Sequence, residues 1–426
     1  MYNEFIEVIS LINVDVVVIG SGAGGSIASF ELTRRGFKVA LLEEGERINL
    51  ENSYKSYTST LSSIEILRTK CLGGSTLVSL GNMVFDASII NKIKNYGIDL
   101  TEEIEAVKRL MHVAEIPSYM LSPFALKFMD VTERRGLNPK IMPKSIRYDK
   151  CSACGMCAYG CPNNAKYTAL DIIELGEKQG LNVITNLKVE SLHRQPLEGE
   201  IIVNGVRYGE KLKVKCRALV LAAGALETPK LLAQVHDDEK IGQNLFIDPF
   251  VTIGGPYDGP SSNMGIQMAA YVDCGDFLLS PHYSGLLPFQ LKVKGVECEG
   301  KQIASIMVKI ADQGEGRVWP NGIIEARMVK KDLEVLERGI EQAKEILVEM
   351  GVKENEIAIT PIRGAHPGGT AAIGSVVSRD LTINGCDGVF VTDASLIPPP
   401  LGKPPIMLIM ALALKVSQRV CEYLRR

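Results

Sequence analysis

The sequence lacks the features that mark membrane-spanning, secreted or nucleic-acid-binding chains. Its longest apolar run, residues 406–414, is far shorter than the ~20 residues that a membrane helix needs. A net charge of −3 offers no basic surface for nucleic acid. Residues 1–13 carry two glutamates and no basic start, so we expect no secretory signal and a cytoplasmic location.

Internal repeats and low-complexity tracts are also absent, and the chain has a single Trp. The 426 residues, 46% hydrophobic and 23% charged, predict two or three domains around a large core. Ten cysteines in a cytoplasmic chain are not expected to form a disulfide framework. Four of them are clustered in residues 151–162, which points to a specific chemistry for that segment.

Residues 14–45 are the strongest signal in the chain. A β-branched run that predicts a buried parallel strand ends at Gly20, and Gly20, Gly22 and Gly25 have the G-x-G-x-x-G spacing. A predicted helix follows to about residue 35, and its N-terminus would point at a pyrophosphate. A second strand then ends in Glu43, whose carboxylate suits the hydroxyls of a ribose. This stretch predicts dinucleotide binding and leaves the choice between FAD and NAD open.

The rest of the pattern predicts an α/β protein: a Rossmann-like FAD-binding domain assembled from both ends of the chain, and a second, antiparallel-sheet (α+β) substrate domain. We expect strands at residues 181–184, 212–222, 303–310, 322–328 and 389–392, and an amphipathic helix at 331–350. The predicted domains are 1–145 (FAD-binding, first part), 146–165 (ferredoxin-like cysteine-rich insertion), 166–249 (FAD-binding, second part), 250–365 (substrate-binding) and 366–426 (FAD-binding, C-terminal part).

Further motifs extend along nearly the whole chain. They are Leu72-Gly73-Gly74-Ser75-Thr76, residues 221–225, residues 241–248, His366-Pro367-Gly368-Gly369-Thr370, and the block from Gly388 to Pro404. With the 14–45 stretch they resemble the glucose–methanol–choline (GMC) family of FAD-dependent oxidoreductases. The resemblance selects FAD over NAD. It also implies non-covalent FAD, because the first histidine, His112, lies beyond the Gly-Gly-Ser loop.

The resemblance implies which residues hold FAD. The fingerprint glycines would hold the pyrophosphate, Glu43 the ribose, Val189 would lie near the adenine, and Asp393 on the ribityl–pyrophosphate side. The implied set is Gly20, Ser21, Gly22, Gly24, Gly25, Glu43, Gly73, Gly74, Ser75, Val189, Ala223, Gly224, Asp393, Ala394 and Pro404.

Two residues are predicted to be catalytic. His366 lies in a family motif, and a histidine suits the base that removes a hydroxyl proton as hydride leaves for flavin. The turn at 402–405 lacks the His or Asn that many members pair with this base, and Ser79 stands nearest another expected Asn. Lys403 in that turn is a candidate to supply the missing electrostatic role at the flavin. The alternative is a lysine that points into water.

Cys151, Cys154, Cys157 and Cys161-Pro162 have the ferredoxin spacing C-x₂-C-x₂-C-x₃-C-P, which predicts ligands of a [4Fe–4S] cluster. Because a single such motif is present, the fourth ligand is either Cys161 or a remote cysteine such as Cys71. A structural zinc and a cysteine loop without metal are the alternatives.

We therefore expect a dehydrogenase that oxidises a small-molecule alcohol through FAD and passes electrons through the cluster to a one-electron carrier such as ferredoxin. The first alternative is a ferredoxin-fed reductase that works in the opposite direction. The second is a non-catalytic redox or electron-transfer subunit. The sequence identifies neither the substrate nor the oligomeric state, and an oligomer is compatible with it.

Overall fold

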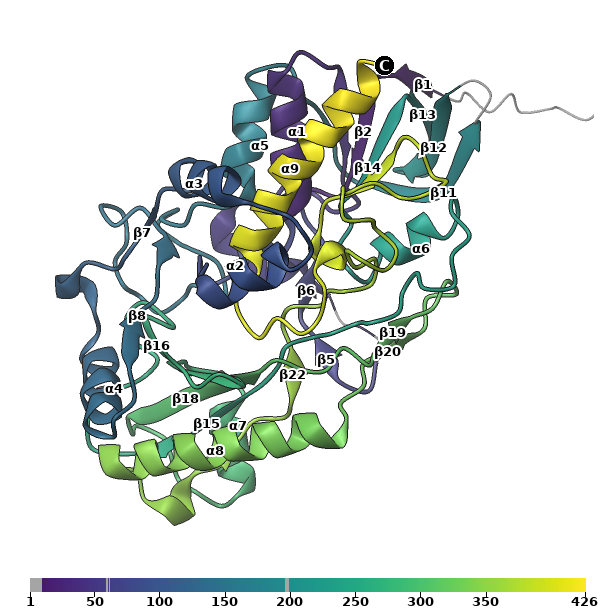
Figure 1. The fold of residues 1–426 in the computed structure, drawn as a ribbon. Coiled ribbons are helices and arrows are strands. Elements are labelled where there is room, and N and C mark those ends of the chain that lie inside the picture. The colour runs from purple at the N-terminus through teal and green to yellow at the C-terminus, as the bar shows by residue number, and fades with distance from the viewer. Residues whose placement is uncertain (1–9, 59, 61, 196–198) are drawn as a thin grey trace, which may run out of the picture.

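The computed structural model describes residues 10–58, 60, 62–195 and 199–426 (Figure 1). Residues 1–9, which carry the two N-terminal glutamates, lie outside the described residues. None of the described helices is long and apolar enough to cross a membrane.

A five-stranded parallel sheet forms the centre of the first layer. Its strand order is β10 (Asn182–Ile184), β3 (Val39–Leu42), β2 (Val16–Ile19), β14 (Ala218–Leu221) and β23 (Val389–Val391). β2, β3, β14 and β23 are completely buried, as their continuous apolar sequences predict for strands covered on both faces. Strands from both ends of the chain share this sheet, which confirms the predicted α/β fold class.

Helices cover one face of the parallel sheet, and a smaller sheet covers the other (Figure 1). The helices are α1 (Ala23–Arg34), α5 (Ala169–Glu177) and α9 (Ile406–Leu424). The smaller sheet has the order β1 (Ser10–Asn13), β13 (Glu210–Cys216), β12 (Glu200–Arg207) and β11 (Leu187–Gln195). The single strand expected at 212–222 is in fact two strands in different sheets, because alternation in β13 changes to a continuous apolar run in β14 at Arg217.

A sheet that is antiparallel except for one pair of strands at its edge forms the second layer, as expected. Its path is β5 (Glu65–Ile66), β22 (Arg363–Gly364), β15 (Pro249–Pro256), β18 (Ile303–Ile310), β17 (Phe277–Pro281), β16 (Ala270–Asp273) and β8 (Pro139–Ile141), and β21 (Ala358–Ile359) pairs with β15. α4 (Pro123–Arg134) and α8 (Lys330–Met350) pack on its outer face (Figure 1). Gly339 in α8 permits this contact, since a Cβ there would lie 2.5 Å from Val308 Cγ1.

Shorter elements connect the layers. The helices are α2 (Ala87–Lys94), α3 (Thr101–Leu110), α6 (Thr228–Leu232) and α7 (Leu287–Val293). Three two-stranded ribbons pair β4 (Tyr57–Thr58) with β6 (Arg68–Thr69), β7 (Val113–Ala114) with β9 (Lys144–Ser145), and β19 (Arg317–Val318) with β20 (Ile324–Glu325). The strand expected at 322–328 is therefore only the two residues of β20.

Candidate functional site

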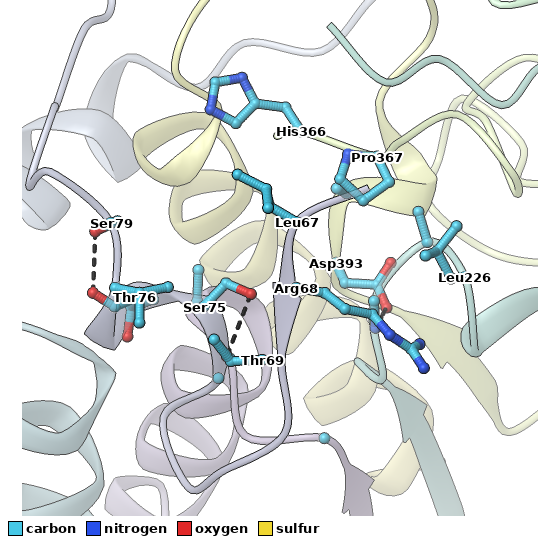
Figure 2. A pocket seen from close by; sticks show the side chains of 18 of the residues that line it. Leu67, Arg68, Thr69, Ser75, Thr76, Ser79, Leu226, His366, Pro367 and Asp393 are labelled. Carbon is cyan, nitrogen blue, oxygen red and sulfur yellow. Dashed lines mark hydrogen bonds between the residues drawn. The ribbon is translucent and has the colours of Figure 1, made fainter. Parts of the chain in front are cut away.

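A cavity of about 460 Å³ is lined by residues from both layers. The carboxyl ends of β2, β3 and β14 reach it from the parallel sheet, and Phe250, Met307 and Lys309 reach it from β15 and β18. Carboxyl ends of parallel strands are where nucleotides bind in this type of fold. Figure 2 shows His366 and Pro367 on the upper side of this pocket, with Ser75, Thr76 and Asp393 below them.

Glycines in the loop at residues 20–25 are required for two different reasons. Gly24 and Gly25 are packed against backbone, because a Cβ would lie 1.6 Å from the Thr392 carbonyl oxygen and 1.9 Å from that of Gly20, respectively. A Cβ at Gly22 would instead meet nothing within 4 Å. Gly22 lines the cavity, and as N-cap of α1 it gives no side-chain hydrogen bond to the helix. The open space above an uncapped helix N-terminus fits a pyrophosphate.

Glu43 is fixed at the cavity wall by three hydrogen bonds. Its Oε2 accepts from the backbone N–H (3.1 Å) and hydroxyl (2.5 Å) of Ser21, and its Oε1 accepts from the Gly45 N–H (2.8 Å). Burial raises the pKa of this carboxyl, and the bonds from Ser21 and Gly45 oppose that effect. Ser21 Oγ also accepts from the Gly73 N–H (2.9 Å), so it joins the fingerprint loop to the Gly-Gly-Ser loop.

Asp393, just after β23, ties together the loops at the other side of the cavity. Its Oδ2 accepts from the Gly224 N–H (2.8 Å) and the Thr228 hydroxyl (2.5 Å), and its Oδ1 accepts from the Ser395 N–H (2.8 Å). Burial raises its pKa, while these hydrogen bonds act in the opposite direction. The carboxyl therefore holds the turn after β14 against the end of β23.

The structure brings most of the implied FAD residues to this one cavity. Those that line it are Gly20, Ser21, Gly22, Gly24, Glu43, Gly74, Ser75, Val189, Ala223, Gly224, Asp393, Ala394 and Pro404. Gly25 and Gly73 are not among the lining residues and support the loops behind the wall. Their individual contacts with FAD stay predictions.

His366 lines the cavity and lies in a network of buried charges. Its Nδ1 is 3.0 Å from Asp248 Oδ2 and 3.2 Å from Lys309 Nζ, and 22% of its side chain is exposed. Lys309 Nζ is 3.8 Å from the same Asp248 oxygen, and both of these residues are almost completely buried. Asp248 Oδ1 accepts from the Gly402 N–H (2.8 Å), and the Asp312 carboxylate accepts from the Asp248 N–H (2.9 Å).

This network favours a neutral His366. Burial lowers its pKa, the Lys309 charge lowers it further, and Asp248 opposes both. Burial also lowers the pKa of Lys309 to about 8, although Asp248 opposes this shift. Burial, with the nearby Asp248 charge, raises the pKa of Asp312 to about 7. With Nδ1–H donating to Asp248, Nε2 of the neutral ring is left as a proton acceptor.

Lys403 does not line this cavity, although the next residue, Pro404, does. Its Nζ lies 2.5 Å from Asp86 Oδ2, 2.7 Å from Asp273 Oδ2 and 2.9 Å from Ser88 Oγ. It is not among the residues that line the cavity, and it does not point into water, since only 7% of it is exposed. The two carboxylates that neutralise it explain this position: they draw the side chain toward α2 and β16.

Three residues of the site were not selected from the sequence. The sequence does mark Lys309, because it is the single charged residue in the mostly apolar run 303–310. Asp248 belonged to a family motif, but its contact with His366 spans 118 positions. His282 lies outside all of the motifs named above, so nothing in the sequence marks it. It lines the cavity with Nδ1 2.9 Å from the Thr252 hydroxyl, and burial lowers its pKa to about 4.

The cysteine segment forms a second, smaller cavity. Cys151, Cys154, Cys157 and Cys161 all line it, and the Ala165 N–H donates to Cys161 Sγ (3.2 Å). Cys71 is buried and is not among its lining residues. All ten cysteines are free thiols. Within the described part of the chain, no three His, Cys, Asp or Glu side chains are grouped so as to hold a metal ion.

The two cavities are neighbours. Ala158, which follows Cys157, lines the large cavity, and the Tyr57 hydroxyl donates to its carbonyl (3.1 Å). Lys166 Nζ donates to the carbonyl oxygens of Cys157 (2.7 Å), Leu77 (2.6 Å) and Ser79 (2.9 Å). Ser79 also lines the large cavity. Lys166 therefore joins the cysteine segment to the wall of the large cavity.

Sequence comparison finds relatives that span nearly the whole chain. The GMC oxidoreductase family profile matches residues 14–250 and 315–413. The uncharacterized protein MJ1450 of Methanocaldococcus jannaschii is 34% identical, over 95% of this chain and 99% of its own length. A long-chain-alcohol oxidase of Arabidopsis thaliana (FAO4B) is 24% identical, over 97% of this chain and 68% of its own.

Solved structures show the same fold. Pyridoxine 4-oxidase from Mesorbium loti has a TM-score of 0.75 at 17% identity, over 96% of this chain and 99% of its own. Formate oxidase of Aspergillus oryzae has a TM-score of 0.76 at 15% identity, over 96% of this chain and 98% of its own. With the two profile matches, the chain belongs to the GMC oxidoreductase family and is an FAD-dependent oxidoreductase.

Proposed function

We propose that this protein is a dehydrogenase that oxidises an alcohol, with His366 as the base. The observation that carries the proposal is the His366–Asp248 contact at the cavity wall. Asp248 accepts a hydrogen bond from Nδ1–H and orients the ring, so that Nε2 can take the hydroxyl proton of the substrate. Bound FAD supplies the acceptor for the hydride that leaves the same carbon, which balances the two-electron oxidation of the alcohol to a carbonyl.

The cavity favours an alcohol with an apolar body. Phe250, Met268 and Met307 line it and belong to one apolar cluster with Leu67 and Leu80. Phe250 is paired with Lys309 across β15 and β18, and Met307 lies two residues from Lys309 on the same strand, so the cluster adjoins the His366 network. The similarity to a long-chain-alcohol oxidase supports the same substrate class.

The test is the reductive half-reaction of a His366→Ala variant, measured by stopped-flow bleaching of the flavin with a series of primary alcohols. We expect a rate about 10²–10⁴-fold below wild type, because a general base contributes that much, with FAD still bound. His193→Ala is the control, since His193 is exposed on β11. A near wild-type rate of flavin reduction in the His366 variant would show that His366 is not the general base.

A second proposal concerns the destination of the electrons. We infer that Cys151, Cys154, Cys157 and Cys161 would hold a [4Fe–4S] cluster, which would supply one-electron transfer to a cytoplasmic carrier such as ferredoxin. Two observations support this: the four thiols line one cavity, and Ala158 beside Cys157 lines the neighbouring FAD cavity. The ferredoxin spacing is the third support.

Cys157→Ser separates this relay from the flavin chemistry. The variant should still bleach its flavin with alcohol, yet fail to reduce a ferredoxin that the wild type reduces. Electron transfer that survives in the variant would exclude the relay. If the reduction potential of the cluster in the wild-type protein is well below that of the flavin, electrons would instead flow from ferredoxin to the substrate, as in a reductase.

A further inference from the structure

His282 is a second histidine in the wall of the large cavity, and the alcohol oxidation proposed above does not use it. It directly follows β17, and its backbone is fixed to β18. Its N–H donates to the Ser305 carbonyl (3.3 Å), and its own carbonyl accepts from the Ser305 hydroxyl (2.7 Å). The half-buried ring lines the cavity. The antiparallel sheet therefore holds this imidazole in a fixed place.

The contact with Thr252 indicates which ring nitrogen of His282 carries the proton. Nδ1 lies 2.9 Å from the Thr252 hydroxyl, and Thr252 is completely buried. Among the described residues, Nδ1 is the hydroxyl's one hydrogen-bond partner, so the hydroxyl proton is paired only if it is donated to Nδ1. Burial lowers the pKa of His282 to about 4, so the ring is neutral near neutral pH. The proton of the neutral ring is then on Nε2.

Nε2–H of His282 is a donor in apolar surroundings. No residue in the described part of the chain accepts a hydrogen bond from it. The Phe250 ring lies edge-on, with the two ring centroids 6.4 Å apart, and Met268 and Met307 line the same cavity. When an apolar molecule fills such a space, the donor loses its hydrogen bonds with water. That loss costs free energy unless the molecule itself supplies an acceptor.

The two imidazoles of the cavity are anchored at neighbouring positions of one sheet. His366 Nδ1 lies 3.2 Å from Lys309 Nζ on β18. Thr252, which holds His282, is on β15 and pairs with Met307, two residues before Lys309. Alternate residues of a strand have their side chains on the same face and lie about 7 Å apart. A molecule that meets His366 at one atom therefore reaches His282 with an atom farther along the sheet.

We propose that His282 is a specificity-determining residue, and that the substrate is an alcohol with a second, uncharged oxygen about 7 Å from the reacting hydroxyl. Nε2–H of His282 donates to that second oxygen, which belongs to a hydroxyl, an ether or a carbonyl. The apolar atoms between the two oxygens pack on Phe250 and Met307. A carboxylate is disfavoured at this position, because one neutral donor does not replace its hydration. This inference rests on the proposed alcohol oxidation and narrows its substrate class.

The first test compares pairs of substrates on the FAD-loaded protein. The probes are α,ω-diols of four to eight carbons, each matched with the primary alcohol in which a methyl group replaces the second hydroxyl. Stopped-flow bleaching of the flavin gives a second-order rate constant for each compound, and the quantity measured is the ratio of the diol value to the monoalcohol value. We expect this ratio to be largest at intermediate chain lengths.

Three variants show whether His282 causes the preference. In His282→Leu the ratio should fall about tenfold, because leucine has no donor for the second oxygen. His282→Gln should keep most of the ratio, because the glutamine amide is a donor. His193→Leu is the control at an exposed position and should keep all of it. Partial unfolding lowers both rate constants alike, so a purely structural role would leave the ratio unchanged.

The second test needs no turnover. Nitrogen NMR on protein with isotope-labelled histidine shows which ring nitrogen is protonated, and the His282 signals are assigned by their loss in His282→Gln. We expect Nε2–H in the wild type and a population of Nδ1–H in Thr252→Val, which lacks the hydroxyl. With the flavin already reduced by dithionite, the Nε2 signal should move when the six-carbon diol is added. The matched monoalcohol should leave this signal in place.

The outcomes separate this inference from the alcohol oxidation. A wild-type ring protonated on Nδ1, or an equal ratio in His282→Leu and the wild type, would overturn the inference. A shifted flavin potential in His282→Leu at an unchanged ratio would show that the donor meets the flavin, which also overturns it. If monoalcohols and diols bleach the wild-type flavin in the same ratio in every variant, the alcohol oxidation stands without this substrate class. If no alcohol bleaches the wild-type flavin, both proposals are wrong.

Discussion

At the residue scale, Lys309 gives the site its pH dependence. The ammonium lies 3.2 Å from His366 Nδ1, and His366 keeps a lowered pKa because of burial and this charge. Other charges face the network too: Lys92 from α2, Asp312 after β18, and Lys403, whose charge acts on Lys309. The wild-type base should therefore be neutral, and active, below the ordinary histidine pKa.

Replacing Lys309 with Met should raise the pKa of His366, because one of its two lowering causes is lost while Asp248 still raises it. The base is then protonated at a higher pH, so the acidic limb of the kcat/KM profile should move to higher pH. Lys301→Met, at an exposed position before β18, should leave the profile unchanged. If the acidic limb of the profile stays in place or moves to lower pH in the Lys309 variant, Lys309 does not lower the pKa of His366.

Gly22 of the fingerprint and its neighbour Gly24 should respond differently to replacement by alanine. At Gly22 the new Cβ meets no protein atom within 4 Å, so Gly22→Ala should fold normally and lose FAD affinity by tenfold or more, since it fills the predicted pyrophosphate position. At Gly24 the Cβ would overlap the Thr392 carbonyl, so Gly24→Ala should fail to fold. Apoprotein melting and FAD titration measure the two effects. Unchanged FAD affinity in the Gly22 variant would place the pyrophosphate elsewhere.

At the element scale, Lys403 joins the turn before α9 to α2 and to β16 through two ion pairs. Its ammonium contacts Asp86, which also caps α2 through Ser88 and Ile89, and Asp273 at the end of β16. We expect Lys403→Met to lower the free energy of unfolding by about 2 kcal/mol, because two partly buried carboxylates lose their partner. Urea unfolding measures this, with the exposed Lys94→Met on α2 as control. A shifted flavin potential at unchanged stability would instead support a role at the flavin.

The sequence predicted well the elements that depend on neighbouring residues, and it predicted poorly the features that depend on contacts between distant residues. The parallel strands, the fingerprint and α8 follow from hydrophobic periodicity and glycine spacing, which are local properties. The split at Arg217 was missed because strand propensity continues across it while the sheet partner changes. Asp248 and Lys309 meet His366 through contacts that span 118 and 57 positions, and local pattern holds no information on such contacts.

At the scale of the whole molecule, the FAD cavity is shared by the parallel sheet and the antiparallel sheet. A ligand there contacts both layers and should stabilise them as one unit. His112, the first histidine of the chain, stacks on Tyr167 (ring centroids 4.4 Å apart) and is not among the residues that line the cavity. This placement favours FAD that is bound without a covalent bond.

Acid precipitation should therefore release FAD into the supernatant and leave a colourless pellet. Refolded or dialysed apoprotein should melt at a lower temperature than the holoprotein. FAD added at a hundred times its Kd should raise the free energy of unfolding by about 2.7 kcal/mol, because the ligand binds only the folded state. Calorimetry should show one transition that moves to higher temperature as FAD is added. Flavin that stays in the pellet would show a covalent bond. If FAD shifted only one of two separate transitions, it would contact one layer alone, and the shared cavity would not be its binding site.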